Sequence, residues 1–206
     1  MLAKVSAIVL AAGLSKRMEG GKKLFLPYGS RTILEEVLYQ LSRSNVDEVI
    51  VVGSEQSIQS IRDITSRDYQ SYKVIENKRY KLGMTTSIQA GVNAAGVDTS
   101  GYMICLADMP KIDFPVYNGL TSAFRKYYVD DQKSILVPVY NNRKGNPVIF
   151  SGDYRNDILN HQEMEGCRGI VQENSSHLHN VKMNSAEVLF DIDTKEQYDQ
   201  AIEKGL

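Results

Sequence analysis

A loop rich in small and basic residues follows the first apolar run of the chain, residues 5–10. In an open α/β sheet, ligands bind beyond the carboxyl ends of the strands. Small residues such as Ala12 and Gly13 expose backbone N–H groups there, and such groups bind phosphate oxygens. Arg17 and a lysine from the pair that closes the loop add the positive charge that a triphosphate requires. The loop therefore predicts a site for a nucleoside triphosphate.

Two familiar phosphate-binding patterns do not match this loop. A Walker A loop has a glycine five residues before its Gly-Lys pair, and this chain has Lys16 there. The same motif has Ser or Thr after the pair, where this chain has Lys23. The dinucleotide fingerprint G-x-G-x-x-G fails because Ser15 stands at its second glycine. The alternative to a triphosphate site is a surface loop with solvated lysines.

Carboxylates follow two further apolar segments. Asp108 comes just after the run at 102–106, and Asp191 and Asp193 follow the segment 188–190. Mg²⁺ prefers one or two carboxylates together with water and phosphate oxygens, so Asp108 at a strand end is a candidate ligand. Alternation along an extended chain places Asp191 and Asp193 on one side. The alternative for each is a solvated or helix-capping aspartate.

An alternation of strands and helices is needed to position these residues. Continuous apolar runs, typical of strands covered on both faces, predict strands at 5–10, 49–52, 74–75, 102–106 and 135–139. Helical spacing predicts helices at 54–67, 85–95 and 114–128, and one from Ile33 to Leu41 capped by Thr32. This order predicts a three-layer α/β/α fold with a mostly parallel, Rossmann-like sheet.

The last part of the chain is less regular. We expect two antiparallel strands and short helices over 148–188. A final helix is expected near 194–204, with Thr194 as its N-cap and Gln197 in the capping-box position. No linker or repeat divides the sequence, so one domain over 1–206 is expected.

Composition and charge indicate the broad class of the protein. The chain has 206 residues with a net charge of −1, which argues against bulk attraction to nucleic acid. Cys105 and Cys167 show no metal-ligand spacing and are expected to be reduced thiols. No run approaches the roughly 18 apolar residues of a membrane span. We expect a cytoplasmic protein without a membrane or nucleic-acid partner.

Several short motifs occur in a fixed order: Leu10-Ala11-Ala12-Gly13, Arg17-Met18, Gly83-Met84-Thr85-Thr86-Ser87, Leu106-Ala107-Asp108-Met109-Pro110, Gly145-Asn146-Pro147-Val148, Gly166-Cys167-Arg168-Gly169 and Asp191-Ile192-Asp193-Thr194. Each motif is weak alone, but the ordered set resembles the MobA-like NTP transferases and, within them, the molybdenum cofactor cytidylyltransferases. The resemblance covers essentially the whole chain. It implies the fold of the nucleotide-diphospho-sugar transferases.

The resemblance also implies roles for individual residues. The segment RMEGGKK carries one extra residue, so Lys22 and Lys23 compete for one role, and Lys23 is favoured because it directly precedes Leu24. Arg17, Lys23 and Asp108 are the implied catalytic residues, and Asp193, with Asp191 as second choice, completes the Mg²⁺ site with Asp108. The implied nucleotide-binding residues are Leu10, Ala11, Ala12, Gly13, Ser15, Arg17, Lys22, Lys23, Gly83 and Ser87.

Asn146, Pro147 and Arg168 are the residues that the resemblance implies on the acceptor side. Two departures affect that side: Asn146 stands where relatives have His, and Cys167 stands where they have Asp. Ala12 before Gly13 resembles the cytidine-using version of the first motif. The implied reaction transfers CMP from CTP to the terminal phosphate of molybdopterin and releases pyrophosphate. The product would then serve a molybdenum hydroxylase.

Three other functions remain open from the sequence. GTP could replace CTP in a molybdopterin guanylyltransferase, or a sugar phosphate could replace the pterin. A non-catalytic nucleotide-binding accessory protein would bind nucleotide without releasing pyrophosphate. No general base is required in the catalytic readings, because a phosphate monoester with a second pKa of about 6 is already largely ionised at pH 7. The three histidines lie outside the motifs and are expected to be surface or structural residues.

Overall fold

The computed structural model describes residues 2–13, 23–67 and 71–203. Within them, eight strands form one sheet in the order β10-β7-β9-β6-β1-β4-β5, with β8 paired to β7. Only β8 and β9 run antiparallel to their neighbours. The bounds are β1 (Val5–Ala11), β4 (Glu48–Gly53), β5 (Lys73–Glu76), β6 (Gly101–Leu106), β7 (Ile135–Tyr140), β8 (Arg143–Lys144), β9 (Val148–Ser151) and β10 (Leu178–Lys182). All five predicted strands are confirmed.

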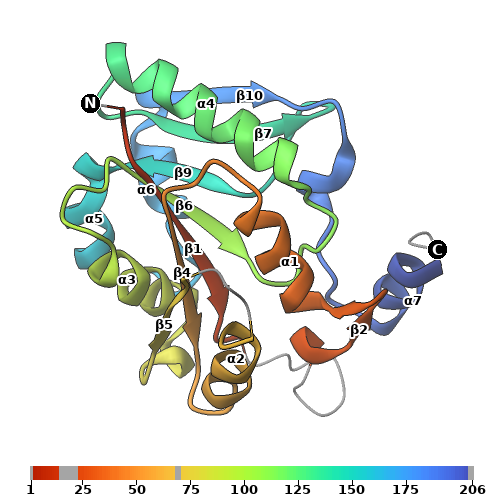
Figure 1. Ribbon diagram of the computed structural model, residues 1–206. Coiled ribbons are helices and arrows are strands. Elements are labelled where there is room, and N and C mark those ends of the chain that lie inside the picture. Colours follow the sequence, from red (N-terminus) through yellow and green to blue (C-terminus); the bar gives the residue numbers. More distant parts are fainter. Residues whose placement is uncertain (1, 14–22, 68–70, 204–206) are drawn as a thin grey trace.

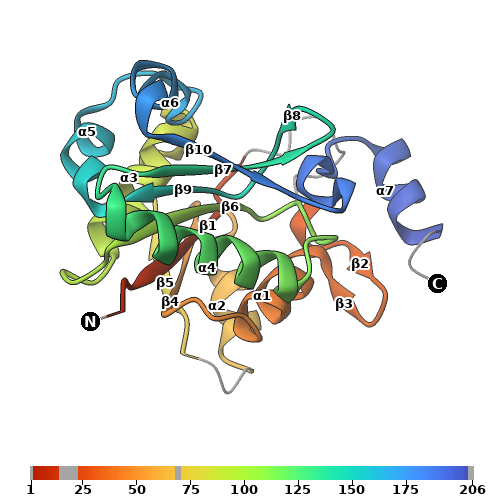
Figure 2. The ribbon, with the colours of Figure 1, turned by 90° about the horizontal axis from the view of Figure 1, so that it is seen from above.

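Helices cover both faces of the sheet, as Figure 2 shows in the view along its edge. On one face lie α1 (Ile33–Ser42), α2 (Ile58–Thr65) and α4 (Phe114–Asp130). On the other lie α3 (Met84–Ala94), α5 (Arg155–Asn160) and α6 (Arg168–Glu173). The final helix, α7 (Lys195–Glu203), stands beyond the end of the sheet (Figure 1). The predicted three-layer architecture is confirmed.

Strand β1 shows why the apolar runs are continuous. Val5, Ala7, Val9 and Ala11 are buried in the core on the side of α1 and α4. The alternate residue Ile8 is buried in the core on the side of α3. Since side chains alternate along a strand, burial on both faces requires an apolar residue at nearly every position.

Local signals fix the helix ends. The Thr32 hydroxyl accepts a hydrogen bond from the Glu35 N–H at 3.3 Å, and the Glu35 carboxylate accepts one from the Thr32 N–H at 2.7 Å. This capping box starts α1 where it was predicted. Helix α2 starts at Ile58, later than the predicted residue 54, because Ser54 and Ser57 bind each other's backbone in a turn.

The region 148–188 differs from its prediction. Strand β9 is antiparallel to β6 and β7, as expected, but β10 runs parallel to β7. The chain between β9 and β10 passes over one face of the sheet through α5 and α6, so it re-enters at the edge in the direction of β7. The second antiparallel strand is β8, which forms a hairpin with β7 through Asn141 and Asn142, both at positive φ.

Short elements connect these parts and carry several site residues. A two-stranded hairpin joins β2 (Pro27–Tyr28) to β3 (Arg31–Thr32). The 3-10 helices are η1 (Lys23–Phe25), η2 (Tyr80–Leu82), η3 (Gly152–Tyr154), η4 (Ser175–His177) and η5 (Ala186–Leu189). No helix of the described chain is both long and apolar enough to cross a membrane.

Candidate active site

A cavity of about 460 Å³ opens at the carboxyl ends of the neighbouring strands β1 and β6. Such an end of a parallel sheet is the usual ligand site of an open α/β fold. Three aspartates lie on its wall beside the last residues of β1. The cavity is lined by Leu10, Ala12, Gly13, Tyr80, Lys81, Gly83, Met84, Ser87, Leu106, Asp108, Met164, Asp191 and Asp193.

Backbone hydrogen bonds bring the distant aspartates together. The Ile192 N–H donates to the Asp108 carbonyl at 3.0 Å, which attaches the segment 191–193 to the end of β6. The Asn146 N–H donates to the Val188 carbonyl at 2.9 Å and holds the preceding turn, η5, against the loop after β8. Asp191 and Asp193 therefore line the cavity from one side and Asp108 from the next strand.

Lys23 joins two of these aspartates. Its ammonium donates to Asp108 Oδ2 at 2.8 Å and to Asp193 Oδ1 at 3.0 Å, and the residue is only 7% exposed. Burial alone would lower the pKa of Lys23, but the charges and hydrogen bonds of Asp108 and Asp193 outweigh it and raise the pKa above its ordinary value. The lysine therefore stays protonated and offsets the repulsion between the carboxylates.

The remaining oxygen of Asp108 tests whether a cation fits this site. Asp108 Oδ1 is buried and accepts no hydrogen bond from the described residues. Such an oxygen is costly to bury unless something positive or hydrogen-bonding meets it. No three His, Cys, Asp or Glu side chains of the described chain form a ready metal cluster. Mg²⁺ needs only one or two carboxylates when substrate phosphates supply other ligands, so the donor set fits that ion.

Asp191 has an environment that disfavours its charged form. Burial raises its pKa, and the negative charges of Asp193 and Asp108 raise it further. Positive charge brought into the cavity would lower this pKa again. A cation in the cavity would therefore favour the ionised form of Asp191.

Another part of the first cavity's wall comes from η2 and the start of α3. Gly83 has a φ of 104°, and a Cβ there would lie 2.4 Å from the Met164 carbonyl oxygen. Only glycine permits this conformation and this close approach. Thr85 binds the same loop, because its hydroxyl donates to the Glu163 carbonyl and accepts from the Gly166 N–H at 3.0 Å. The segments around 83–87 and 163–166 thus form one wall.

A second cavity of about 350 Å³ lies next to the first and shares Met84 and Leu106 with it. Its walls are largely apolar, and its polar side chains include Lys144, Asn146, Glu165 and Arg168. The full lining is Met84, Ile88, Ile104, Leu106, Val137, Lys144, Gly145, Asn146, Val148, Phe150, Glu165, Gly166, Cys167, Arg168 and Val171. Two adjoining cavities could hold two substrates side by side.

Most predicted site residues meet at these cavities. The first cavity contains Leu10, Ala12, Gly13, Gly83, Ser87, Asp108, Asp191 and Asp193, and Lys23 bonds to two of them. Ala11 instead points into the core on the α1 side, and Pro147 is buried outside the second cavity's lining. Ser15, Arg17 and Lys22 lie outside the described residues.

Several cavity residues were not predicted. Tyr80, Lys81 and Met164 line the first cavity from loops and η2. Their sequence surroundings carry no phosphate or metal pattern, so only the folded chain reveals them. Lys144 lines the second cavity in the same way, from the short hairpin after β7.

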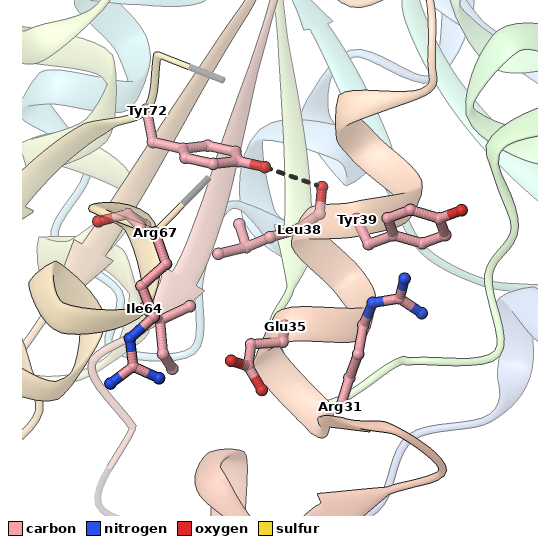
Figure 3. Close-up of a pocket in the computed structure, with 8 residues that line it drawn as sticks. Arg31, Glu35, Leu38, Tyr39, Ile64, Arg67 and Tyr72 are labelled. Carbon is pink, nitrogen blue, oxygen red and sulfur yellow. Dashed lines mark hydrogen bonds between the residues drawn. The ribbon is translucent and has the colours of Figure 1, made fainter. Parts of the chain in front are cut away.

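A third, smaller cavity of about 190 Å³ lies between α1 and the end of α2 (Figure 3), and Asp108, Asp191 and Asp193 are not in its lining. It contains none of the predicted site residues. Two of its charged groups already have partners: Arg31 pairs with Glu36 at 3.1 Å, and Glu35 caps α1. The Tyr72 hydroxyl donates to the Leu38 carbonyl at 3.4 Å. These bonds indicate a structural role for the third cavity's walls.

An α/β/α fold with carboxylates and a buried lysine at the sheet's carboxyl edge suits a protein that binds a phosphorylated ligand together with a divalent cation. The model of the MobA-like NTP transferase domain matches residues 7–181. The chain therefore belongs to this family of nucleotidyltransferases.

Individual relatives agree with that membership. The chain is 25% identical over 205 residues to the molybdenum cofactor cytidylyltransferase of Escherichia coli (strain K12), with 98% of each chain covered. It is 30% identical over 174 residues to a protein of Methanosarcina acetivorans named "Probable molybdenum cofactor guanylyltransferase", with 75% of this chain and 72% of that protein covered.

Solved structures show the same fold. The crystal structure of Rv0371c from Mycobacterium tuberculosis H37Rv superimposes with a TM-score of 0.82 at 19% identity, covering 98% of this chain and 100% of that one. A structure of the same protein in complex with manganese gives a TM-score of 0.76 at 20% identity, covering 98% and 99%.

Proposed function

We propose that this protein transfers CMP from CTP to the terminal phosphate of a molybdopterin-type acceptor and releases pyrophosphate. The observation that carries the proposal is the convergence of Asp108, Asp193 and Lys23 beside a cavity at the end of β1. The cytidylyltransferase relative, which matches over nearly the full length of both chains, favours CTP and the pterin.

In this proposal each cavity holds one substrate. The nucleotide lies in the first cavity, with its phosphates toward Gly13 and the loop that contains Arg17. The acceptor lies in the second, where apolar walls suit a ring system and Lys144 and Arg168 bring positive charge for its phosphate. Because Met84 and Leu106 line both cavities, the two reacting phosphates can meet at their junction.

The reaction forms a bond between an acceptor phosphate oxygen and the α-phosphorus of CTP. The bond from that phosphorus to the α–β bridging oxygen breaks, and pyrophosphate carries the electron pair away. Arg17 and Lys23 offset the charge on the leaving pyrophosphate. The acceptor phosphate is already ionised near neutral pH, so no side chain has to remove a proton.

Asp108 and Asp193 would hold Mg²⁺, with Asp191 as the alternative second ligand. The orphaned Oδ1 of Asp108 and the manganese complex of a protein with this fold support a divalent cation here. Bound Mg²⁺ supplies charge stabilisation and substrate orientation in phosphoryl chemistry. Lys23 keeps the two carboxylates together until a cation joins them.

Both cysteines are free thiols, which agrees with a reaction in the cytoplasm.

Pyrophosphate release tests the proposal. CTP, GTP, ATP and UTP are each offered with Mg²⁺, and with molybdopterin or with a panel of sugar phosphates. We expect release with CTP and the pterin. Release with GTP alone would identify a guanylyltransferase, and release only with a sugar phosphate would change the acceptor class. Nucleotide binding without release from any pair would favour a non-catalytic accessory protein.

A further inference from the structure

Asn77 is a buried polar residue that the proposed reaction does not use. It follows β5, is 5% exposed, and lies beneath the start of α3. Its Oδ1 accepts the Arg79 N–H at 2.9 Å. Because a backbone N–H can only donate, this bond fixes the amide so that Nδ2 faces Thr86 and Ser87.

Thr86 confirms this direction independently. Its hydroxyl has one proton, which it donates to the carbonyl of Gly83 at 2.9 Å or of Arg79 at 3.0 Å. The hydroxyl oxygen must therefore accept the bond from Asn77 Nδ2, at 2.9 Å. The direction of every hydrogen bond around Asn77 is thus determined.

Ser87 receives the second proton of the Asn77 amide. Its Oγ accepts from Nδ2 at 3.0 Å, so this bond leaves the hydroxyl's own proton unused. No bond from that proton to another residue occurs among those described, and Ser87 lines the first cavity. The hydroxyl can therefore donate into the cavity while Asn77 holds its oxygen.

We propose that Asn77 is a positioning residue that fixes the Ser87 hydroxyl as a hydrogen-bond donor to an acceptor atom of the nucleobase. This inference rests on the proposed function, because it requires a nucleotide in the first cavity. Cytosine presents two acceptors, N3 and O2, on its pairing edge. Guanine presents N–H donors at N1 and N2 and a single acceptor there. A fixed donor thus favours cytosine over guanine.

Asn77→Asp tests the direction of the network. A carboxylate cannot donate a hydrogen bond. In this variant the Ser87 hydroxyl must therefore donate its proton to the carboxylate, which leaves only the lone pairs of Oγ to face the cavity. The affinities of CTP and GTP, measured by calorimetry with Mg²⁺ and no acceptor, give the readout. The added negative charge weakens the binding of CTP and GTP equally, whereas the loss of the hydrogen-bond donor weakens the binding of CTP selectively. We expect the CTP-to-GTP affinity ratio to fall about fivefold to tenfold.

Two further variants separate this role from a purely structural one. Ser87→Ala should lower the ratio by a similar factor, and the double variant Asn77→Asp/Ser87→Ala should lower it no further. Thr86→Val removes the other hydrogen bond of Asn77 Nδ2 and leaves the bond to Ser87 in place. It should lower the melting temperature and leave the ratio unchanged.

An unchanged ratio in Asn77→Asp or Ser87→Ala overturns the inference, as does a lowered ratio in Thr86→Val. If the wild-type protein binds CTP in that experiment, the proposed function survives the failure. Absence of binding of any triphosphate to the wild type contradicts the proposed function and the inference together.

Discussion

A buried lysine that bonds to two aspartates is the central residue-scale feature of the site. The phosphate contact predicted for Lys23 from the sequence stays a prediction; in the structure its ammonium bonds to Asp108 and Asp193. The motif that carries Lys23 indicates proximity to the phosphates but not its partners. Those partners lie 85 and 170 residues away, and only the packed sheet brings them within bonding distance.

Replacing Lys23 by alanine should destabilise the protein, because Asp108 and Asp193 would both lose the ammonium group that bonds to them. The two aspartate side chains are partly exposed to solvent, which weakens their ion pairs with Lys23. We therefore expect a loss of roughly 1–3 kcal/mol in the free energy of unfolding, measured in urea. Mg²⁺ should restore more stability to this variant than to the wild type.

Lys195→Ala is the matched control for that experiment. Lys195 faces Asp199 at 3.9 Å on the surface of α7, and its side chain is 80% exposed. This variant should unfold like the wild type. If Lys23→Ala is as stable as Lys195→Ala and gains nothing from Mg²⁺, Lys23 does not hold the carboxylates together.

The turn η5 shows how one element positions the carboxylates of another segment. A Cβ at Gly145 would lie 2.2 Å from the Val188 carbonyl oxygen, so Gly145→Ala must push the turn away. We expect a loss of about 1–3 kcal/mol in stability and a weaker response to Mg²⁺. Gly119→Ala is the control, because Gly119 is exposed on α4 with nothing within 4 Å.

The control should gain up to about 1 kcal/mol, since alanine favours a helix interior. Thermal unfolding of both variants with and without Mg²⁺ gives the comparison. Equal stability of Gly145→Ala and wild type would show that the contact with η5 is not tight and that the turn does not fix Asp191 and Asp193.

The end of α4 carries an aspartate that two histidines of the β10 region hold. Asp131 accepts from His177 at 2.9 Å and from His179 at 3.0 Å, which agrees with the structural role expected for the histidines. Burial would raise the pKa of Asp131, but the hydrogen bonds from His179 and His177 outweigh it and lower the pKa. The ionised carboxylate therefore stabilises the folded state above the unfolded pKa of about 3.9.

This stabilisation is lost as the pH falls through the lowered pKa of the folded state. Asp131→Asn should accordingly melt below the wild type near neutral pH, and the difference should shrink as the pH falls below about 4. Melting temperatures across this range measure it. A melting-temperature difference that grows on acidification would contradict the claim that the ionised carboxylate of Asp131 stabilises the folded state. Pyrophosphate release should be unaffected.

Elements were predictable where local chemistry decides them. Apolar runs gave the five predicted strands, and Thr32 with Glu35 gave the start of α1. The direction of β10 was not predictable, because an apolar pattern specifies a strand but not its orientation. That orientation depends on the path of α5 and α6 across the sheet.

At the scale of the whole molecule, the sheet gathers residues from five separate parts of the chain into one cavity. The ordered motifs identified most of these residues, since motifs mark where strands end. They did not identify Met164, which reaches the cavity because Thr85 bonds to its loop. The two adjoining cavities that share Met84 also appear only in the folded chain.

The central claim is that this site transfers a nucleotide to a phosphate. In the most direct test, the protein is incubated with Mg²⁺, molybdopterin and CTP that carries ³²P at its α-phosphate. The fate of the ³²P label is then followed. We predict that the label enters an organic product equimolar with the pyrophosphate released. Asp108→Asn should remain folded and lose this transfer by at least about a thousandfold. Full transfer by that variant, or label recovered only in free CMP, would contradict the account.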